Sequence, residues 1–116
     1  MRNIAVEKSI EVDLLTIEYC EILEEKKKYV IAKQLLKSGT SIGANIHEAQ
    51  NAESRSDFIH KIKIATKELE ETKYWITLCE QSQNYPSTRI LKDKVKELGL
   101  ILYKILSTSI KSKRQN

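Results

Sequence analysis

A heptad seam between Phe58 and Cys79 constrains the fold of this chain more than any other feature. Its seven members are separated by alternating steps of four and three residues, and only the threonine is polar: Phe58, Ile62, Ala65, Leu69, Thr72, Ile76 and Cys79. This spacing places all seven side chains on one side of an α-helix and is typical of a helix that packs lengthwise against other helices. The segment therefore predicts a long, core-facing helix.

Signals for the ends of helices flank this segment. Ser54 and Asp57 have the Ser-x-x-acid spacing of a capping box directly before the seam. The one proline, Pro86, follows it, and either Ser87 or Thr88 can cap a fourth helix. That helix carries apolar residues at helical spacing: Leu91, Val95, Leu98, Leu102 and Ile105.

Two more helices are predicted before the seam. Residues 4–24 carry apolar side chains at helical spacing, and the charged run 24–28 separates them from a second periodic segment. With 116 residues, three glycines and one proline, the chain fits a single all-α domain over residues 1–116. Four amphipathic helices joined by short connections predict an antiparallel up-down-up-down four-helix bundle. Residues 111–116 are expected to fray.

The stretch SGTSIGANIHEAQ, residues 38–50, is unusual in a helical chain. Gly39 and Gly43 lie four residues apart, hence on one helix face, where the absence of β-carbons lets another backbone approach closely. Either the second helix continues through this stretch with a kink near Gly39–Gly43, or a loop divides it and Ser41 caps the second piece. The continued periodicity through Ile42, Ile46 and Ala49 favours one kinked helix.

The segments SIGANIHEA (41–49) and IATKELEET (64–72), with Asp-Phe-Ile at 57–59 between them, resemble a known family. They are similar to the four-helix-bundle proteins encoded within intervening sequences of bacterial 23S ribosomal RNA genes. They also resemble a relative, the accessory variability protein of diversity-generating retroelements. The residues that match the family pattern are Ser41, Ile42, Asn45, Ile46, Glu48, Phe58, Ala65 and Leu69.

This resemblance implies a bacterial bundle that assembles as a ring-like homopentamer with a basic surface. In the retroelement branch it also implies binding of nucleic acid and of a reverse transcriptase, whereas the ribosomal branch implies no established activity. The matching residues are expected to be structural: the apolar ones fill the core, and Asn45 and Glu48 hydrogen-bond a helix end or a neighbouring helix. Family members often carry Ala where this chain has His47, so the resemblance does not make His47 a catalyst.

The positive charge is concentrated in the second half of the chain, where residues 59–116 hold 12 Lys and Arg against 6 Asp and Glu. On the fourth helix, Arg89, Lys92 and Lys96 form a stripe at i, i+3 and i+7, and Lys104 and Lys111 continue it. Such a stripe suits a phosphate backbone and predicts non-specific, salt-sensitive binding of RNA or DNA.

The alternative is a solvated face, because Asp93 and Glu97 interrupt the stripe. In that case the protein is a protein-interaction scaffold without a direct nucleic-acid role. Trp75, next to the seam, is expected to pack at the edge of the core rather than to stack on a base.

Apolar residues outside the expected core predict self-association. Leu100 and Tyr103 point away from the core arc of the fourth helix, and Val6 and Val12 are further candidates on the first helix. Small bundles that leave such groups in water usually cover them in an oligomer, although scattered apolar surface residues are also normal.

Enzymatic chemistry is disfavoured by the residue pattern. Asp57 and His60 have metal-ligand spacing, but the second Glu-x-x-His motif of a dimetal bundle is missing. We therefore expect no catalytic residues, metal or cofactor. Cys20 and Cys79 are predicted to be free thiols, and no apolar run is long enough to span a membrane, so a cytoplasmic location is expected. The RNA or DNA preference and the cellular partner stay open.

Overall fold

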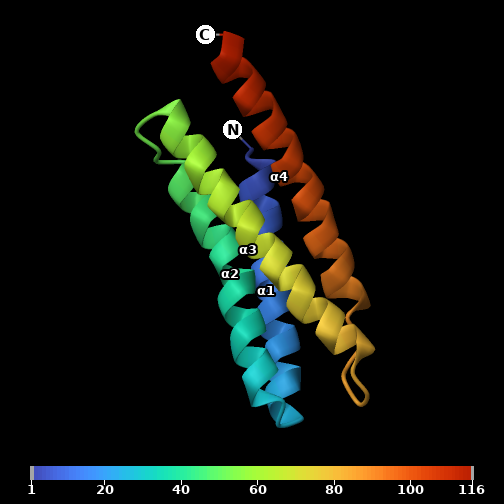
Figure 1. Ribbon diagram of the computed structural model, residues 1–116. Coiled ribbons are helices and arrows are strands. Elements are labelled where there is room, and N and C mark those ends of the chain that lie inside the picture. Colours follow the sequence, from blue (N-terminus) through green and yellow to red (C-terminus); the bar gives the residue numbers. More distant parts are fainter. Residues whose placement is uncertain (1, 116) are drawn as a thin grey trace.

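The computed structural model describes residues 2–115, with side chains through residue 112. It is an all-α bundle of four helices, as predicted: α1 (Ile4–Glu25), α2 (Tyr29–Ala49), α3 (Arg55–Gln81) and α4 (Arg89–Gln115). Figure 1 shows successive helices running in opposite directions along an elongated body of 52 × 23 × 22 Å. Each helix packs on its neighbours in sequence, and α4 closes the bundle against α1.

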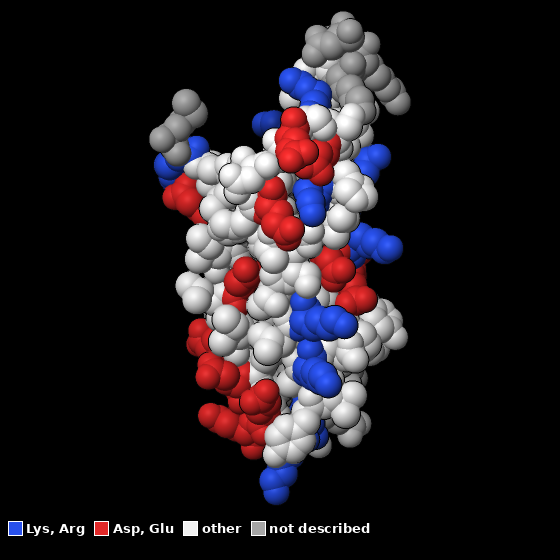
Figure 2. All heavy atoms as spheres, turned by 90° about the vertical axis from the view of Figure 1, so that its left-hand side faces the viewer, with Lys and Arg blue, Asp and Glu red and all other residues white. Residues whose placement is uncertain are grey.

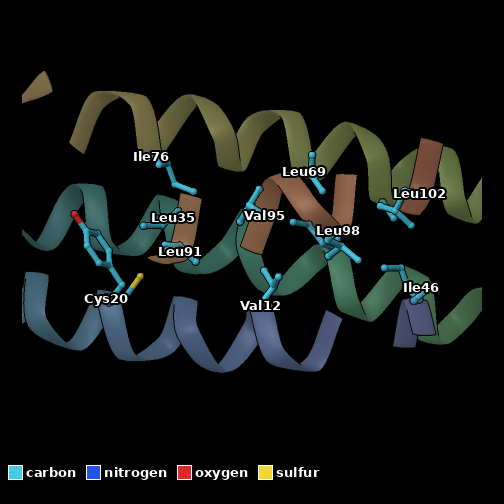
Figure 3. Close-up of a cluster of buried hydrophobic side chains, with 14 of the residues drawn as sticks. Val12, Cys20, Leu35, Ile46, Leu69, Ile76, Leu91, Val95, Leu98 and Leu102 are labelled. Carbon is cyan, nitrogen blue, oxygen red and sulfur yellow. The ribbon is translucent and has the colours of Figure 1, made fainter. Parts of the chain in front are cut away.

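The core runs the length of the bundle and receives side chains from all four helices (Figure 3). The heptad seam of α3 faces this core: six of its seven residues are buried and Phe58 is half-buried. Within the seam, the Thr72 hydroxyl lies 3.0 Å from the Ser38 hydroxyl and 2.8 Å from the Glu68 carbonyl oxygen. The one polar seam residue is therefore satisfied in the core.

The core face of α1 is not its most apolar face. Val12 is only 1% exposed, and the buried Ser9 and Thr16 lie on the same side. Their hydroxyls donate to the carbonyls of Val6 at 2.8 Å and Val12 at 2.7 Å, so burial leaves neither unsatisfied. Val12 was predicted to face an oligomer interface, and this is wrong because its side chain fills the core of the monomer.

The glycine-containing stretch is helical throughout, since α2 continues without interruption to Ala49. The alternative of a loop dividing this helix is therefore wrong, while the kink stays a prediction. Gly39 lies directly against α1: a β-carbon there would be 2.6 Å from the Thr16 Cγ2 atom. Gly43 lies against the carboxylate of Asp13 in the same way. The two glycines thus allow a close approach of α1 and α2.

The ends of α3 and α4 follow the predicted signals. The Asp57 N–H donates to the Ser54 hydroxyl at 3.0 Å, which confirms the cap of α3. At the start of α4, the Arg89 N–H donates to the Ser87 hydroxyl at 3.3 Å. The backbone of α4 is helical to Gln115, so it includes most of the segment 111–116 that was expected to fray. Asn116 and the side chains from residue 113 onward lie outside the described residues.

We expect Gly39→Ala to destabilise the protein. Alanine adds helix propensity of about 1 kcal/mol, but its methyl group meets Thr16, whose hydroxyl is held by the Val12 carbonyl. Overpacking of this kind costs about 1–3 kcal/mol. The expected net result is a loss of about 1 kcal/mol in the free energy of unfolding, measured by urea denaturation.

Gly99→Ala in α4 is the matched control. Its β-carbon would meet the end of the Leu69 side chain at 3.2 Å, a contact that a shift of a few tenths of an ångström relieves, and the helix gains the same propensity. Unchanged or increased stability is expected here. If Gly39→Ala stabilised the protein as much as Gly99→Ala does, the close packing of α1 on α2 would not constrain the fold.

Candidate nucleic-acid interface

Three lysines meet at a groove between α3 and α4. Lys73 from α3 and Lys92 and Lys96 from α4 surround a hollow of about 260 Å³ with Ile76 and Val95 at its floor; we call it the α3–α4 groove. The stripe on α4 predicted Lys92 and Lys96, but Lys73 was missed. Its only sequence signal is a basic residue one position after the seam residue Thr72, which does not indicate proximity to α4.

Ion pairs neutralise part of this cluster. Lys92 Nζ lies 2.7 Å from a Glu80 carboxylate oxygen, and Lys73 Nζ lies 3.6 Å from Glu70. Arg89 and Lys96 are exposed and form no ion pair with any side chain that the structure describes. These two cations are therefore the ones most available to an external anion.

Lys104 and Lys111 are exposed but do not join the groove. Lys104 lies beside Ile101 and Ile105, over the side of α4 that faces the start of α1. Lys111 lies farther along α4, next to Tyr103. Of the five predicted contact residues, only Lys92 and Lys96 line the α3–α4 groove. Arg89 lies in an adjoining hollow with Glu80, Lys92 and Asp93, and Lys104 and Lys111 lie apart from both.

An ion-pair network joins α4 to α1 and takes up Glu97, one of the two acids that interrupt the stripe, whereas Asp93 is exposed and lies outside this network. Lys8 lies 2.9 Å from Glu97, and Lys94 lies 2.9 Å from Glu11. The hydrogen bond from Lys8 holds the pKa of Glu97 below its ordinary value, and the hydrogen bond from Lys94 does the same for Glu11. Glu97 is therefore directed to α1, away from Arg89 and Lys96.

The face opposite α4 has a different charge pattern. Figure 2 shows acidic side chains gathered toward its lower left, with basic side chains standing singly or in pairs. Mixed charge of this kind does not suit a polyanion as well as the side that carries α4.

Most of the apolar family-motif residues lie in the core. Ile42, Ile46, Ala65 and Leu69 are buried. Glu48 pairs with Lys61 at 3.3 Å and so joins α2 to α3, as expected of a bond to a neighbouring helix.

Two polar motif residues bond within α2 itself. The Ser41 hydroxyl donates to the Lys37 carbonyl at 2.7 Å, and the Asn45 amide donates to the Ser41 carbonyl at 2.8 Å. Asn45 was expected to bond a helix end or a neighbouring helix, and this prediction is wrong because the residue four positions earlier supplies the acceptor.

The apolar residues predicted to lie on the surface of α4 are exposed, and α1 carries a second exposed apolar surface that was not predicted. Leu100 and Tyr103 are 66% and 73% exposed, and with Lys96 they fall at i, i+4 and i+7, on one side of the helix. Val6 is half-buried against the core. On α1, Ile10, Leu14 and Ile17 form an exposed stripe at the same spacing. This stripe is the more apolar side of α1, so helical spacing alone does not distinguish it from the core side.

A partly buried acid lies where α1 crosses α2. Asp13 faces Gly43, and its Oδ1 atom is buried without a hydrogen-bond partner among the described residues. Burial raises the pKa of Asp13 to about 7, and nearby His47 counteracts only part of this effect. His47 Nδ1 lies 2.7 Å from the Gly43 carbonyl oxygen, so this nitrogen carries the proton and donates it.

Within the described residues, no three His, Cys, Asp or Glu side chains gather closely enough to hold a metal ion. Cys20 and Cys79 are free and buried, and burial raises the pKa of Cys20 to about 12. None of the helices in the described part of the chain is both long and apolar enough to cross a membrane.

A family model described as 23S rRNA-intervening sequence protein matches residues 1–104. The chain belongs to the 23S rRNA-intervening sequence protein family. The match covers all of α1, α2 and α3 and the first part of α4, including Arg89, Lys92 and Lys96. The resemblance seen in the motif residues is thereby confirmed.

A solved structure agrees with this assignment. It is the crystal structure of a protein with unknown function from the S23 ribosomal protein family of Bacteroides thetaiotaomicron, 37% identical to this chain with a TM-score of 0.83. The likeness covers 88% of this chain and 97% of the other. No curated protein matches the chain. Membership of the 23S rRNA-intervening sequence protein family therefore establishes the fold without assigning an activity.

We expect Asp13 to make the stability of the fold depend on pH. Because its pKa rises from 3.8 to about 7 on folding, the folded protein keeps a proton that the unfolded chain releases at lower pH. The stabilisation of the folded state by this proton is fully present below about pH 4 and is lost as the pH rises through about 7. Asparagine does not ionise, so Asp13→Asn avoids this loss of stability at high pH. The variant is expected to be more stable than wild type at pH 8 by about 1 kcal/mol.

Urea denaturation at pH 4, 6 and 8 measures this difference. Glu18→Gln is the control, since it removes a negative charge at an exposed position of the same helix and so separates burial from net charge. A wild-type advantage over Asp13→Asn that grows with pH would contradict the expectation.

Proposed function

We propose that this chain is a non-enzymatic, oligomeric accessory protein that binds the phosphate backbone of RNA or DNA. Arg89 and Lys96 are the principal contacts: Lys96 lies with Lys73 and Lys92 at the α3–α4 groove, and Arg89 lies in the neighbouring hollow that Lys92 also lines. The single observation that carries the proposal is this group of cations from two helices, two of which have no internal partner among described residues. Backbone contacts of this kind are salt-sensitive and carry no base sequence information.

Two further features of the proposal follow from the same surface. An oligomer repeats the cationic cluster on every subunit, which raises the affinity for a long polyanion through multivalency. The resemblance implies a homopentamer, and the exposed Leu100 and Tyr103 provide apolar area for subunit contact. We place this function in the cytoplasm, where two buried free cysteines stay reduced.

The nucleic-acid proposal predicts a selective effect of charge reversal. Arg89→Glu combined with Lys96→Glu is expected to weaken binding of RNA and duplex DNA by at least about tenfold at low salt, because it removes the two unpaired cations. The logarithm of the affinity should fall linearly with the logarithm of salt for wild type, with a smaller slope for the variant. Fluorescence anisotropy with labelled strands measures both.

The matched control is Lys33→Glu with Lys37→Glu. It makes the same change in net charge on α2, where both lysines are exposed. Equal losses in the two double variants would mean that overall charge alone attracts the polyanion. No binding by wild type at low salt would exclude the proposed function.

Self-association is tested through the apolar side of α4. Leu100→Ser combined with Tyr103→Ser is expected to lower the solution mass, because both side chains are mostly exposed in the monomer and their removal takes apolar area from the interface. Light scattering measures this mass. Val30→Ser, at an exposed position of α2, is the control. A wild-type mass of 13.4 kDa at micromolar concentration would contradict the oligomer.

The second candidate function is a protein-interaction scaffold, favoured by the same exposed pair on α4. Its partner would be another protein, and the resemblance to the accessory variability protein makes a reverse transcriptase one candidate. The two functions respond differently to substitution: the scaffold survives reversal of Arg89 and Lys96 and is lost when Leu100 and Tyr103 become serine.

A further inference from the structure

Aromatic and basic side chains share a cavity at the lower end of the bundle, where the α1–α2 turn meets the α3–α4 loop. The cavity has a volume of about 510 Å³, and we call it the aromatic cavity. Five of the residues that line it combine rings with positive charge: Tyr29, Trp75, Tyr85, Lys27 and Lys28. None of them belongs to the α3–α4 groove.

The rings are held in place but remain accessible. Tyr29, the first residue of α2, is 60% exposed. Trp75 is half-buried against the core, as its position beside the seam predicted, and Tyr74 meets it edge-on with 5.1 Å between ring centroids. The Lys28 ammonium lies 5.2 Å from the centroid of the Tyr85 ring. An aromatic surface of this kind needs little ordering before a planar ligand stacks on it.

The charge at this end is positive but not uniformly so. Residues 26–28 are three consecutive lysines, and the first turn of α2 contains no acidic residue. Glu24 and Glu25 precede them at the end of α1, but in the described part of the chain no ion pair joins these acids to the three lysines. Figure 2 shows a basic side chain projecting from the lower end, with acidic side chains nearby.

We propose that the aromatic cavity binds an unpaired nucleotide of single-stranded RNA or DNA. The base stacks on Tyr29 and Trp75, and Lys27 and Lys28 contact the adjoining phosphates. Proteins that bind single strands combine these two elements, because every base has a face that stacks and every nucleotide carries a phosphate. A duplex keeps its bases paired and stacked internally, so only its backbone is available to the α3–α4 groove.

This inference rests on the proposed nucleic-acid role but uses separate residues. The cavity therefore adds a preference for single strands to a protein whose α3–α4 groove contacts backbone in either form. Charge complementarity favours a polyanion over a two-fold contact with a second copy of the chain, because such a copy would bring the same three lysines against this end.

The chain contains one tryptophan, which makes the test local. Intrinsic fluorescence of Trp75 is recorded while an unlabelled oligothymidylate of about ten nucleotides is added, and a duplex of the same length is added in parallel. The expected result is saturable quenching by the single strand and little quenching by the duplex, although anisotropy reports binding of both.

Tyr29→Ala is the test variant, and its exposed position keeps the core intact. Loss of one stacking ring is expected to weaken single-strand binding by about fivefold or more and to leave duplex affinity within about twofold. Leu14→Ala, which removes an exposed large side chain from α1 at a position outside both proposed sites, is the matched control and should retain the quenching.

Several outcomes would overturn the inference. Single-strand binding without a change in Trp75 emission would place the strand elsewhere. A change in solution mass of Tyr29→Ala, with unchanged affinity, would assign the cavity to self-association. If the duplex binds but single strands cause no quenching, the aromatic cavity is not a nucleotide site, and the proposed function still holds. Quenching that persists when Arg89 and Lys96 are reversed and duplex binding is lost supports the cavity independently of the α3–α4 groove.

Discussion

The close approach of α1 and α2 is the constraint on which the rest of the bundle depends. Gly39 and Gly43 present no β-carbons, so the Thr16 and Asp13 side chains lie against the backbone of α2. Thr16 satisfies its hydroxyl within α1 and can be buried at this contact. Because the small and polar side of α1 faces inward here, its apolar stripe of Ile10, Leu14 and Ile17 is directed outward. The packing of α1 on the glycines of α2 therefore determines which side of α1 lies in the core and which lies on the surface.

Ion pairs across α1 and α4 decide which cations remain available. Lys94 and Glu97 look like parts of one mixed helix face, but each pairs with a residue of α1. The other side of α4 keeps Arg89 and Lys96, with the acidic Asp93 between them in sequence. Two lysines nearby are held by Glu70 and Glu80. Surface pairs contribute little to stability, and here their larger effect is to separate a neutralised side of α4 from a cationic one.

The cationic side of α4 also carries Leu100 and Tyr103, so one surface combines the properties expected of a nucleic-acid site and of a subunit interface. The two uses are compatible if subunits meet at the far part of α4 while the α3–α4 groove stays open near its start. The aromatic cavity lies at the lower end of the bundle, beside the α3–α4 loop that leads into α4. Single strands that contact both would run along this end of the molecule.

The sequence by itself determined four helices, the seam of α3, the cap at Ser54 and the family, because these depend on local spacing and on contiguous motifs. It also determined which α4 cations are exposed. Only the tertiary structure decided that Val12 is core and Leu14 is surface, since both sides of α1 have helical spacing and the glycines of α2 select between them. Lys73 and the aromatic cavity depend on residues distant in sequence meeting across helices, and periodicity within one segment carries no information about that contact.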